Sequence, residues 1–291
     1  MKERLTIALL CCSFSTLAAP QIIAHRAGTD DAPENTLVAI DSSLKNGANA
    51  IWITLQLSKD QIPVLYRPSA LEKLTDKTGK VSDYSQKELA NVDAGWNFGD
   101  NDHPFRGKGI HIPSLEEVLK QYPDTFFYLD IKSPDAEPTV LAKALSDVLN
   151  KNNSLKRIRV YSTEAKYLAA LPAEIPRFET RDETRSLLAN ISLSHTCNIN
   201  AKDKQPRWYG LELKRDVEVV ESFTLGEGRS KATLTWDEEA MKCFRSQGNA
   251  HIIFFGINNE QDYQQAVKLK ADGVMVNSPA KFKSILKQRK S

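Results

Sequence analysis

Beyond residue 20 the chain alternates short apolar runs with segments whose apolar residues recur every three or four positions. The runs are typical of buried strands, and the recurring spacing is typical of amphipathic helices. Strands that alternate with helices predict parallel βα units, and eight such units predict an α/β fold closed into a (β/α)8 TIM barrel. The eight predicted strands span residues 21–27, 50–58, 126–133, 157–163, 177–180, 208–214, 250–258 and 273–278.

The clearest helical patterns lie at 37–44, 115–119 and 140–148, and the last helix is expected to begin at Ser278-Pro279, a capping serine followed by proline. Two stretches do not fit a bare barrel. Residues 67–112, rich in Asp, Gly, Asn and Lys, predict an extended loop or small insertion after the second strand. Residues 215–235 contain Gly226-Glu227-Gly228 between Val- and Thr-containing runs and predict a β-hairpin.

The N-terminus has the pattern of a secretory signal peptide. Lys2 and Arg4 precede an uncharged stretch, residues 5–17, and small residues follow. We expect residues 1–18 to be removed after Ala18, and residues 19–291 to form a single barrel domain. The uncharged stretch is shorter than the roughly 20 apolar residues that cross a bilayer, so no transmembrane segment is expected. The predicted location is therefore periplasmic or secreted.

Removal of this leader leaves two cysteines, Cys197 and Cys243. An oxidising compartment would allow them to pair, but sequence cannot place them within bonding distance, so a disulfide and two separate thiols both stay open.

The formal net charge of +2 gives no reason to expect a nucleic-acid partner. The basic residues at 281–290 are expected to form the solvated face of the last helix, and contact with an anionic membrane surface is the alternative.

Charged residues lie at the ends of two predicted strands. His25 and Arg26 follow the first strand, and Asp130 and Lys132 lie two apart, on one side of the strand at 126–133. The carboxyl ends of barrel strands meet at one face, where the chemistry of such folds takes place. Because unpaired buried charges are costly, these four groups are expected to bind an anion, a metal or one another.

Residues 24–36, Ala-His-Arg-Ala-Gly-Thr-Asp-Asp-Ala-Pro-Glu-Asn-Thr, resemble the first strand, loop and helix of the glycerophosphodiester phosphodiesterase family. Further matching motifs follow in the family's order at 57–64, 112–117, 129–132, 256–258 and 271–279. The resemblance implies a TIM barrel that cleaves phosphodiesters of glycerol. It also implies a divalent cation held by three carboxylates, and two histidines that act as general acid and base.

Carried over by position, His25 corresponds to the first histidine of the family and Asp130 to the third carboxylate. The resemblance further implies that Arg26 and Lys132 face the phosphate, and that Glu34 and Asn35 lie beside it at the start of the first helix.

The chain departs from the family at several positions, three of which affect the metal ligands and the second histidine. Trp52 and Thr54 stand where the family has its Glu-x-Asp metal ligands, and Arg67 stands where it has the second histidine. One carboxylate does not hold Mg²⁺ or Ca²⁺ well, so no cofactor is expected unless unidentified ligands complete a cation site. Arginine cannot replace histidine in proton transfer, because its pKa stays above about 12.

These departures remove two negative charges and add one positive charge. Arg26, Arg67 and Lys132 could therefore hold a phosphate without a metal, with Arg67 as a bidentate clamp and His25 as a lone acid or base. Two function classes stay open. One is an exported phosphodiesterase acting on glycerophosphodiesters or lysophospholipid head groups, and the other is an inactive binding or regulatory protein for the same phosphate ligands. An alternative for Arg67 is an ion pair with Asp130 or Glu34 that fills an abandoned site.

Overall fold

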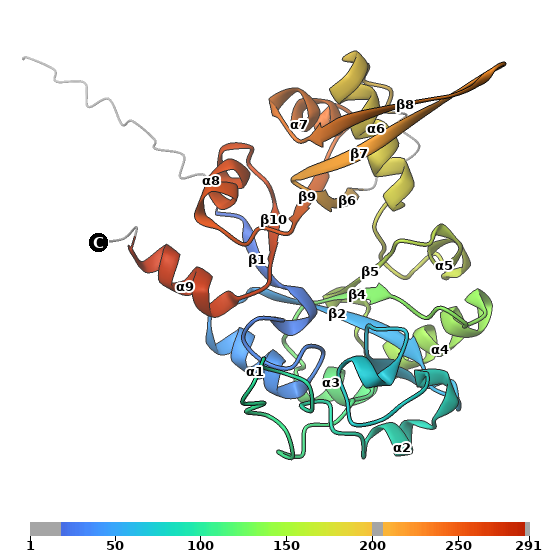
Figure 1. Ribbon diagram of the computed structural model, residues 1–291, viewed down its shortest axis with the longest axis vertical. Helices are drawn as coiled ribbons and strands as arrows, with labels where there is room; N and C mark the ends of the chain where they lie inside the picture. Colours follow the sequence, from blue (N-terminus) through green and yellow to red (C-terminus); the bar gives the residue numbers. More distant parts are fainter. Residues whose placement is uncertain (1–18, 200–205, 289–291) are drawn as a thin grey trace, which may run out of the picture.

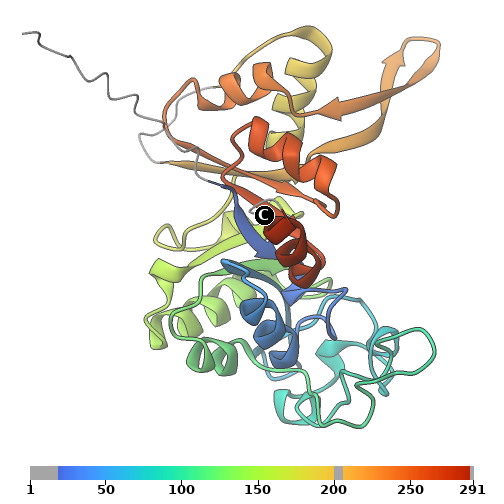
Figure 2. The ribbon, with the colours of Figure 1, turned by 90° about the vertical axis from the view of Figure 1, so that its left-hand side faces the viewer.

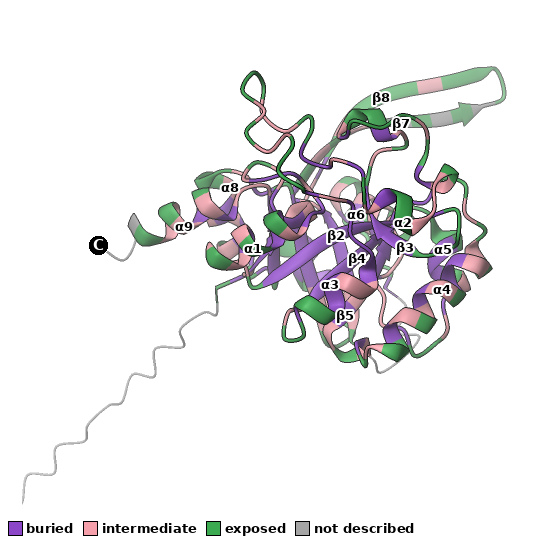
Figure 3. Ribbon diagram, turned by 90° about the horizontal axis from the view of Figure 1, so that it is seen from below, coloured by how far each residue is buried: buried purple, intermediate pink, exposed green. Residues whose placement is uncertain are grey.

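The computed structural model describes residues 19–199 and 206–288, so the predicted leader lies outside the described residues. Parallel strands form the centre of the molecule and helices surround them (Figure 1). The strands are almost entirely buried, whereas the outer faces of the helices are exposed (Figure 3). The predicted α/β barrel is confirmed.

Seven parallel strands follow one another around the sheet in the order β5-β4-β2-β1-β10-β9-β6. Each is rich in β-branched and aromatic residues, which suit a strand buried on both faces. Their bounds are β1 Gln21–Ala24, β2 Ala50–Leu57, β4 Phe127–Ile131, β5 Ile158–Ser162, β6 Arg207–Glu212, β9 Ala250–Phe255 and β10 Gly273–Val276.

The predicted strand at 177–180 is not a regular strand, although it occupies the eighth place. The Phe178 amide donates to the Val160 carbonyl of β5 (2.9 Å), and the Glu179 amide donates to the Trp208 carbonyl of β6 (2.8 Å). These two bonds join the ends of the sheet. The pairing stays short because Pro176 has no N–H to donate and Thr180 already caps the next helix.

The predicted helices at 37–44, 115–119 and 140–148 are confirmed, and the last helix begins at Pro279. The Ser278 hydroxyl accepts from the Lys281 amide (3.1 Å), as expected of a capping serine. Within 19–199 and 206–288, no helix is long and apolar enough to cross a membrane. The outer helices are α1 Leu37–Lys45, α3 Leu115–Gln121, α4 Pro138–Lys151, α5 Ala165–Ala170, α6 Arg181–Ser194, α7 Glu238–Arg245, α8 Glu260–Lys268 and α9 Pro279–Gln288.

Two additions lie at opposite ends of the molecule (Figures 1 and 2). After β2, the short strand β3 (Pro63–Leu65) pairs with it antiparallel and leads into residues 67–112. This insertion contains α2 (Gln86–Leu89) and has its own buried apolar cluster, which includes Leu71, Leu89 and Ile110. At the other end, β7 (Lys214–Phe223) and β8 (Gly226–Thr235) form the predicted hairpin.

The structure joins Cys197 and Cys243 in a disulfide, with Cα atoms 5.8 Å apart. The bond connects the segment after α6 to α7 across 46 positions of sequence. Both helices flank the base of the β7–β8 hairpin (Figure 1). The two alternatives left open by the sequence are therefore resolved in favour of pairing, which typically stabilises a fold by about 2–4 kcal/mol.

Candidate active site

A cavity of about 590 Å³ lies at the carboxyl ends of the barrel strands. The side chains that line it come from the ends of at least five strands, as is usual for catalytic sites in this fold. Positive charge predominates among them. The lining includes the cations Arg26, Arg67, Lys132, Arg181 and Arg215, and the carboxylates of Asp130 and Glu212.

The turn after β1 has an unusual backbone. Arg26 and Ala27 have φ values of 46° and 66°, and Gly28 follows with φ 95°. Successive left-handed residues are costly for side chains larger than glycine, and such strain often marks functional sites. A Cβ atom on Gly28 would lie 2.6 Å from the Ser43 hydroxyl, which itself donates to the Ala27 carbonyl (2.6 Å). The turn therefore requires glycine here, and it directs His25 and Arg26 to the cavity.

His25 is held by Asn277, which follows β10. The His25 Nδ1 and Asn277 Oδ1 atoms lie 2.8 Å apart. Because an amide oxygen only accepts, Nδ1 carries the hydrogen and Nε2 retains a lone pair. Burial lowers the pKa of His25 to about 4, and the positive charges of Arg26 and Arg67 act in the same direction. The imidazole is therefore neutral at pH 7 and can accept a proton.

Residues at the start of the first helix hold this turn in place. Arg26 Nη1 donates to Glu34 Oε2 at 2.8 Å in a half-buried ion pair. The Asn35 side-chain oxygen accepts from the Thr54 amide on β2, also at 2.8 Å. Glu34 and Asn35 thus attach the loop to the barrel rather than extending into the cavity.

Asp130 and Lys132 share one wall of the cavity. Lys132 Nζ donates to the Thr163 hydroxyl (2.7 Å) and forms a longer ion pair with Asp130 Oδ1 (3.6 Å). Burial raises the pKa of Asp130 to about 6, although the Lys132 charge and the Trp52 indole oppose this. Asp130 Oδ1 is buried without a hydrogen-bond partner among the described residues. Its nearest cation is Lys132, so this buried oxygen helps to hold the lysine on the cavity wall.

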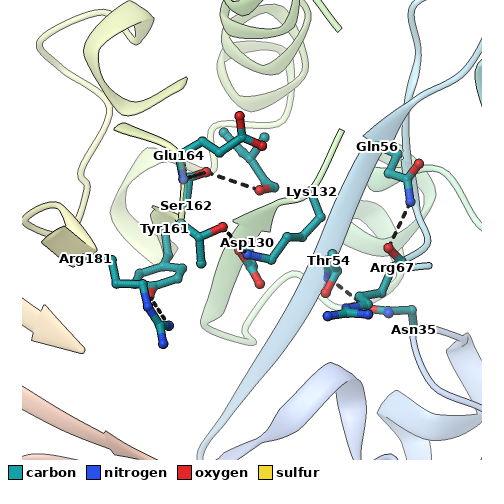
Figure 4. A network of polar contacts seen from close by, with 12 residues as sticks. Asn35, Thr54, Gln56, Arg67, Asp130, Lys132, Tyr161, Ser162, Glu164 and Arg181 are labelled. Carbon is teal, nitrogen blue, oxygen red and sulfur yellow. Dashed lines mark hydrogen bonds and ion pairs between the residues drawn. The ribbon is translucent and has the colours of Figure 1, made fainter. Parts of the chain in front are cut away.

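Arg67 is exposed at the cavity mouth, and its backbone carbonyl accepts a hydrogen bond from the Gln56 side chain (Figure 4). The Gln56 amide donates to the carbonyls of Tyr66, Arg67 and Pro68 at 2.8–3.2 Å. In the described parts of the chain no carboxylate forms an ion pair with Arg67. The expected alternative, a pair with Asp130 or Glu34, is absent because each of those carboxylates has another cation beside it.

Trp52 forms the floor of the cavity and is only 2% exposed. Its ring centroid lies 5.1 Å from those of Tyr161 and Phe255, and 5.7–5.9 Å from those of Tyr128 and Phe178. The indole is thus part of the aromatic interior of the barrel, and the space above it stays open.

Sequence reasoning missed three charged residues that line the cavity, namely Arg181, Glu212 and Arg215. Arg181 Nη2 lies 2.8 Å and 3.2 Å from the two oxygens of Glu212, and Arg215 Nη1 lies 2.8 Å from Glu212 Oε1. The signal was available, because Glu212 lies at the carboxyl end of a predicted strand, as Asp130 does. Arg181 likewise directly follows the predicted strand at 177–180.

The cavity does not fit the divalent cation that the resemblance implies. Among residues 19–199 and 206–288, no group of three or more His, Cys, Asp or Glu side chains is placed to hold a metal ion. Trp52 and Thr54 supply no carboxylate, and Asp130 and Glu34 already lie beside cations of the chain. Ca²⁺ prefers about 6–8 oxygen ligands, several of them carboxylate. The residues around the cavity therefore do not make a site for a divalent metal ion.

Comparison with known proteins identifies the family. The model of the glycerophosphoryl diester phosphodiesterase family matches residues 25–281. The Mycobacterium tuberculosis protein Rv2277c is 42% identical over 270 residues, 89% of this chain and 87% of that protein. A glycerophosphodiester phosphodiesterase of Bacillus subtilis is 24% identical over 275 residues, 91% of this chain and 86% of that one.

Solved structures agree. The glycerophosphoryl diester phosphodiesterase domain of the same M. tuberculosis protein has a TM-score of 0.84 at 39% identity and covers 92% of this chain and 100% of that domain. An Oleispira antarctica phosphodiesterase, solved with the product sn-glycerol-3-phosphate, shares the fold with a TM-score of 0.66 at 21% identity, over 92% and 97% of the two chains. The chain belongs to the glycerophosphoryl diester phosphodiesterase family.

Proposed function

We propose that the protein hydrolyses glycerophosphodiesters or lysophospholipid head groups at a cationic phosphate site that uses no metal ion. The observation that carries the proposal is the cavity in which His25 lies among Arg26, Arg67 and Lys132. Cationic donors fixed by the fold can stabilise the charge that develops on a phosphoryl group, which is the task otherwise given to a cation.

Phosphate binding follows from the unequal pairing of the cations. Arg26 and Lys132 each lie beside one carboxylate, whereas Arg67 has its guanidinium at the mouth without one in the described chain. Its planar fork can donate two parallel hydrogen bonds to a phosphate. The Asp130 carboxylate also lines the cavity, and its oxygen other than the covered Oδ1 can accept a hydrogen bond from a hydroxyl of the glycerol moiety.

His25 supplies the acid–base chemistry. Nε2 takes a proton from water or from a substrate hydroxyl as its oxygen attacks phosphorus, and the bond from phosphorus to the leaving oxygen breaks. The imidazolium then returns the proton to that leaving oxygen. The second histidine of the family is replaced by Arg67, so one imidazole performs both transfers. Turnover is therefore expected to be slow, because a lost acid or base costs about 10²–10⁴ in rate.

The same replacement favours a second candidate function. A barrel that holds a phosphate ligand without turnover would use the cations and leave His25 as a hydrogen-bonding group. Incubation with a panel of glycerophosphodiesters and lysophospholipids, with detection of released glycerol phosphate, distinguishes the two. Product formation supports the enzyme, and ligand capture without product would favour the binding protein. We also propose export, which the predicted leader at residues 1–18 supports.

Replacing Arg67 with glutamine should weaken binding of sn-glycerol-3-phosphate by about tenfold or more, because hydrogen bonds to charged groups contribute about 1.5–3 kcal/mol. Isothermal titration calorimetry measures the change. Arg106→Gln is the matched control, since Arg106 stacks on Trp96 in the insertion and does not line the cavity. Equal affinities of the wild type and Arg67→Gln would show that Arg67 does not bind phosphate.

In the Asp130→Asn variant, activity should persist as the pH falls from 7 to 5 and decline only near pH 4. The reason is the lowered pKa of His25, about 4, which keeps the imidazole neutral throughout that range. Asp130 titrates near pH 6 and can add its own inflection, which Asp130→Asn removes. A pH profile of kcat/KM tests this. A decline with a midpoint near 6.5, retained in Asp130→Asn, would mean that His25 titrates as in water.

A further inference from the structure

The side of the cavity formed by Arg181, Glu212 and Arg215 has no role in the chemistry proposed above. Arg181 opens α6 and contacts the Tyr161 hydroxyl through Nη1 (3.3 Å), while Glu212 ends β6 and Arg215 lies at the base of the hairpin. All three line the same cavity as His25 and Arg67. They belong to α6, β6 and β7, in the C-terminal half of the chain, whereas His25 follows β1.

The three side chains leave net positive charge. Both arginines donate to the same Glu212 oxygen at 2.8 Å, so these three side chains together carry one net positive charge. Arg215 Nε is buried without a hydrogen-bond partner in the described chain. Arg181 also sits in the first turn of a helix, where the dipole already favours negative charge rather than a cation. A group with these properties favours an anion.

Lys132 lies between this group and the phosphate site. Figure 4 shows Tyr161 and Arg181 to one side of Lys132, and Thr54 and Arg67 to the other. Burial lowers the pKa of Lys132, and the charges of both Arg181 and Arg67 lower it further, against the effect of Asp130. The positive charges of Arg67 and Arg181 therefore both act on Lys132, and all three residues line the same cavity.

We propose that Arg181 and Arg215, held by Glu212, form a second anion subsite, so that the preferred substrate is a glycerophosphodiester whose head group carries an additional negative charge. This inference rests on the proposed function, because it assumes that the phosphodiester lies between Arg67 and Lys132. The added charge is a carboxylate or a second phosphate, since planar guanidinium groups bind both.

A cationic head group is the natural competitor, because aromatic rings and a carboxylate also line the cavity. Trp52, Tyr161 and Phe255 are each at most 7% exposed, so they offer little ring surface to a quaternary ammonium ion. The carboxylate of Glu212 is already bonded to two arginines. The structure therefore favours an anion over choline.

The test compares head groups that differ by one carboxylate. Glycerophosphoserine carries the ethanolamine skeleton plus a carboxylate, and glycerophosphocholine serves as the cationic probe. We expect the wild type to bind glycerophosphoserine about tenfold more tightly than glycerophosphoethanolamine, measured by calorimetry, with a similar preference in kcat/KM. Glycerophosphoglycerol and its terminal phosphate ester form a second pair that distinguishes an added phosphate from an added carboxylate.

Arg215→Gln should reduce the serine-to-ethanolamine ratio to near one. Arg229→Gln, on the same hairpin and paired with Glu218 and Glu227 outside the cavity, should leave it unchanged. If the wild type prefers glycerophosphoserine in binding but does not turn it over, the proposed hydrolysis is contradicted and the proposed subsite is supported. Three results would each overturn the subsite, whether or not turnover occurs. The first is that neither an added carboxylate nor an added phosphate improves affinity. The others are tighter binding of glycerophosphocholine, and equal serine-to-ethanolamine ratios in the wild type and Arg215→Gln.

Discussion

Replacing His25 with alanine should lower the turnover of glycerophosphodiesters by about 10²–10⁴-fold, the contribution typical of a general acid or base. The effect is expected in kcat, because phosphate binding depends mainly on the cations around the cavity. His25 is the imidazole of the site, held at Nδ1 by Asn277, and Arg67 cannot replace it in proton transfer. Steady-state kinetics on the substrate that the panel identifies would measure the loss.

His111→Ala is the matched control. His111 precedes α3, and its Nε2 lies 3.0 Å from Oε1 of Glu117 in that helix. His111 does not line the cavity, so its loss should leave kcat unchanged. His25→Gln, which keeps a side chain that can hydrogen bond to Asn277, guards against a simple folding defect. If both His25 variants retained wild-type kcat, His25 could not be the acid–base group.

Replacing Trp52 with alanine should lower the free energy of unfolding by about 3–5 kcal/mol, as expected when a large buried aromatic side chain is truncated. Trp52 is 2% exposed and contacts four aromatic rings in the barrel interior. The cavity that alanine leaves would lie directly below the candidate active site. Urea denaturation followed by circular dichroism gives the difference.

Trp96→Ala provides the comparison for Trp52. Trp96 is 36% exposed in the insertion and contacts Arg106 on one face, so its removal should cost less than about 1 kcal/mol. A Trp52→Ala protein as stable as the wild type would contradict the assignment of Trp52 to the core. Its indole would then act mainly as a ligand-binding surface.

The barrel could be predicted from the sequence because its strands are short apolar runs and its helices have regular spacing. The segment at 177–180 shows the limit of that reasoning. Its composition resembles a strand, but Pro176 and the capping role of Thr180 leave room for only a short pairing, and these effects depend on neighbours. The disulfide was likewise undecidable, since Cys197 and Cys243 are 46 positions apart and only the fold brings them together.

The site was predictable where charged residues end strands, as at His25, Asp130 and Lys132. The same rule applied to Glu212 would have found the opposite wall. The partners of the arginines could not be predicted, because Arg26 reaches Glu34 only through the left-handed turn at 26–28. Arg67 has no carboxylate partner among residues 19–199 and 206–288, because Glu34 and Asp130 each lie beside another cation.

The central claim is that phosphodiester cleavage here depends on the cations of the chain and on His25, without a metal ion. Turnover of the glycerophosphodiester panel by the wild type and His25→Ala, each with and without EDTA, tests it most directly. We predict wild-type turnover that is unchanged by EDTA and lost in His25→Ala. Wild-type turnover that EDTA abolishes and added Mg²⁺ or Ca²⁺ restores would contradict the account.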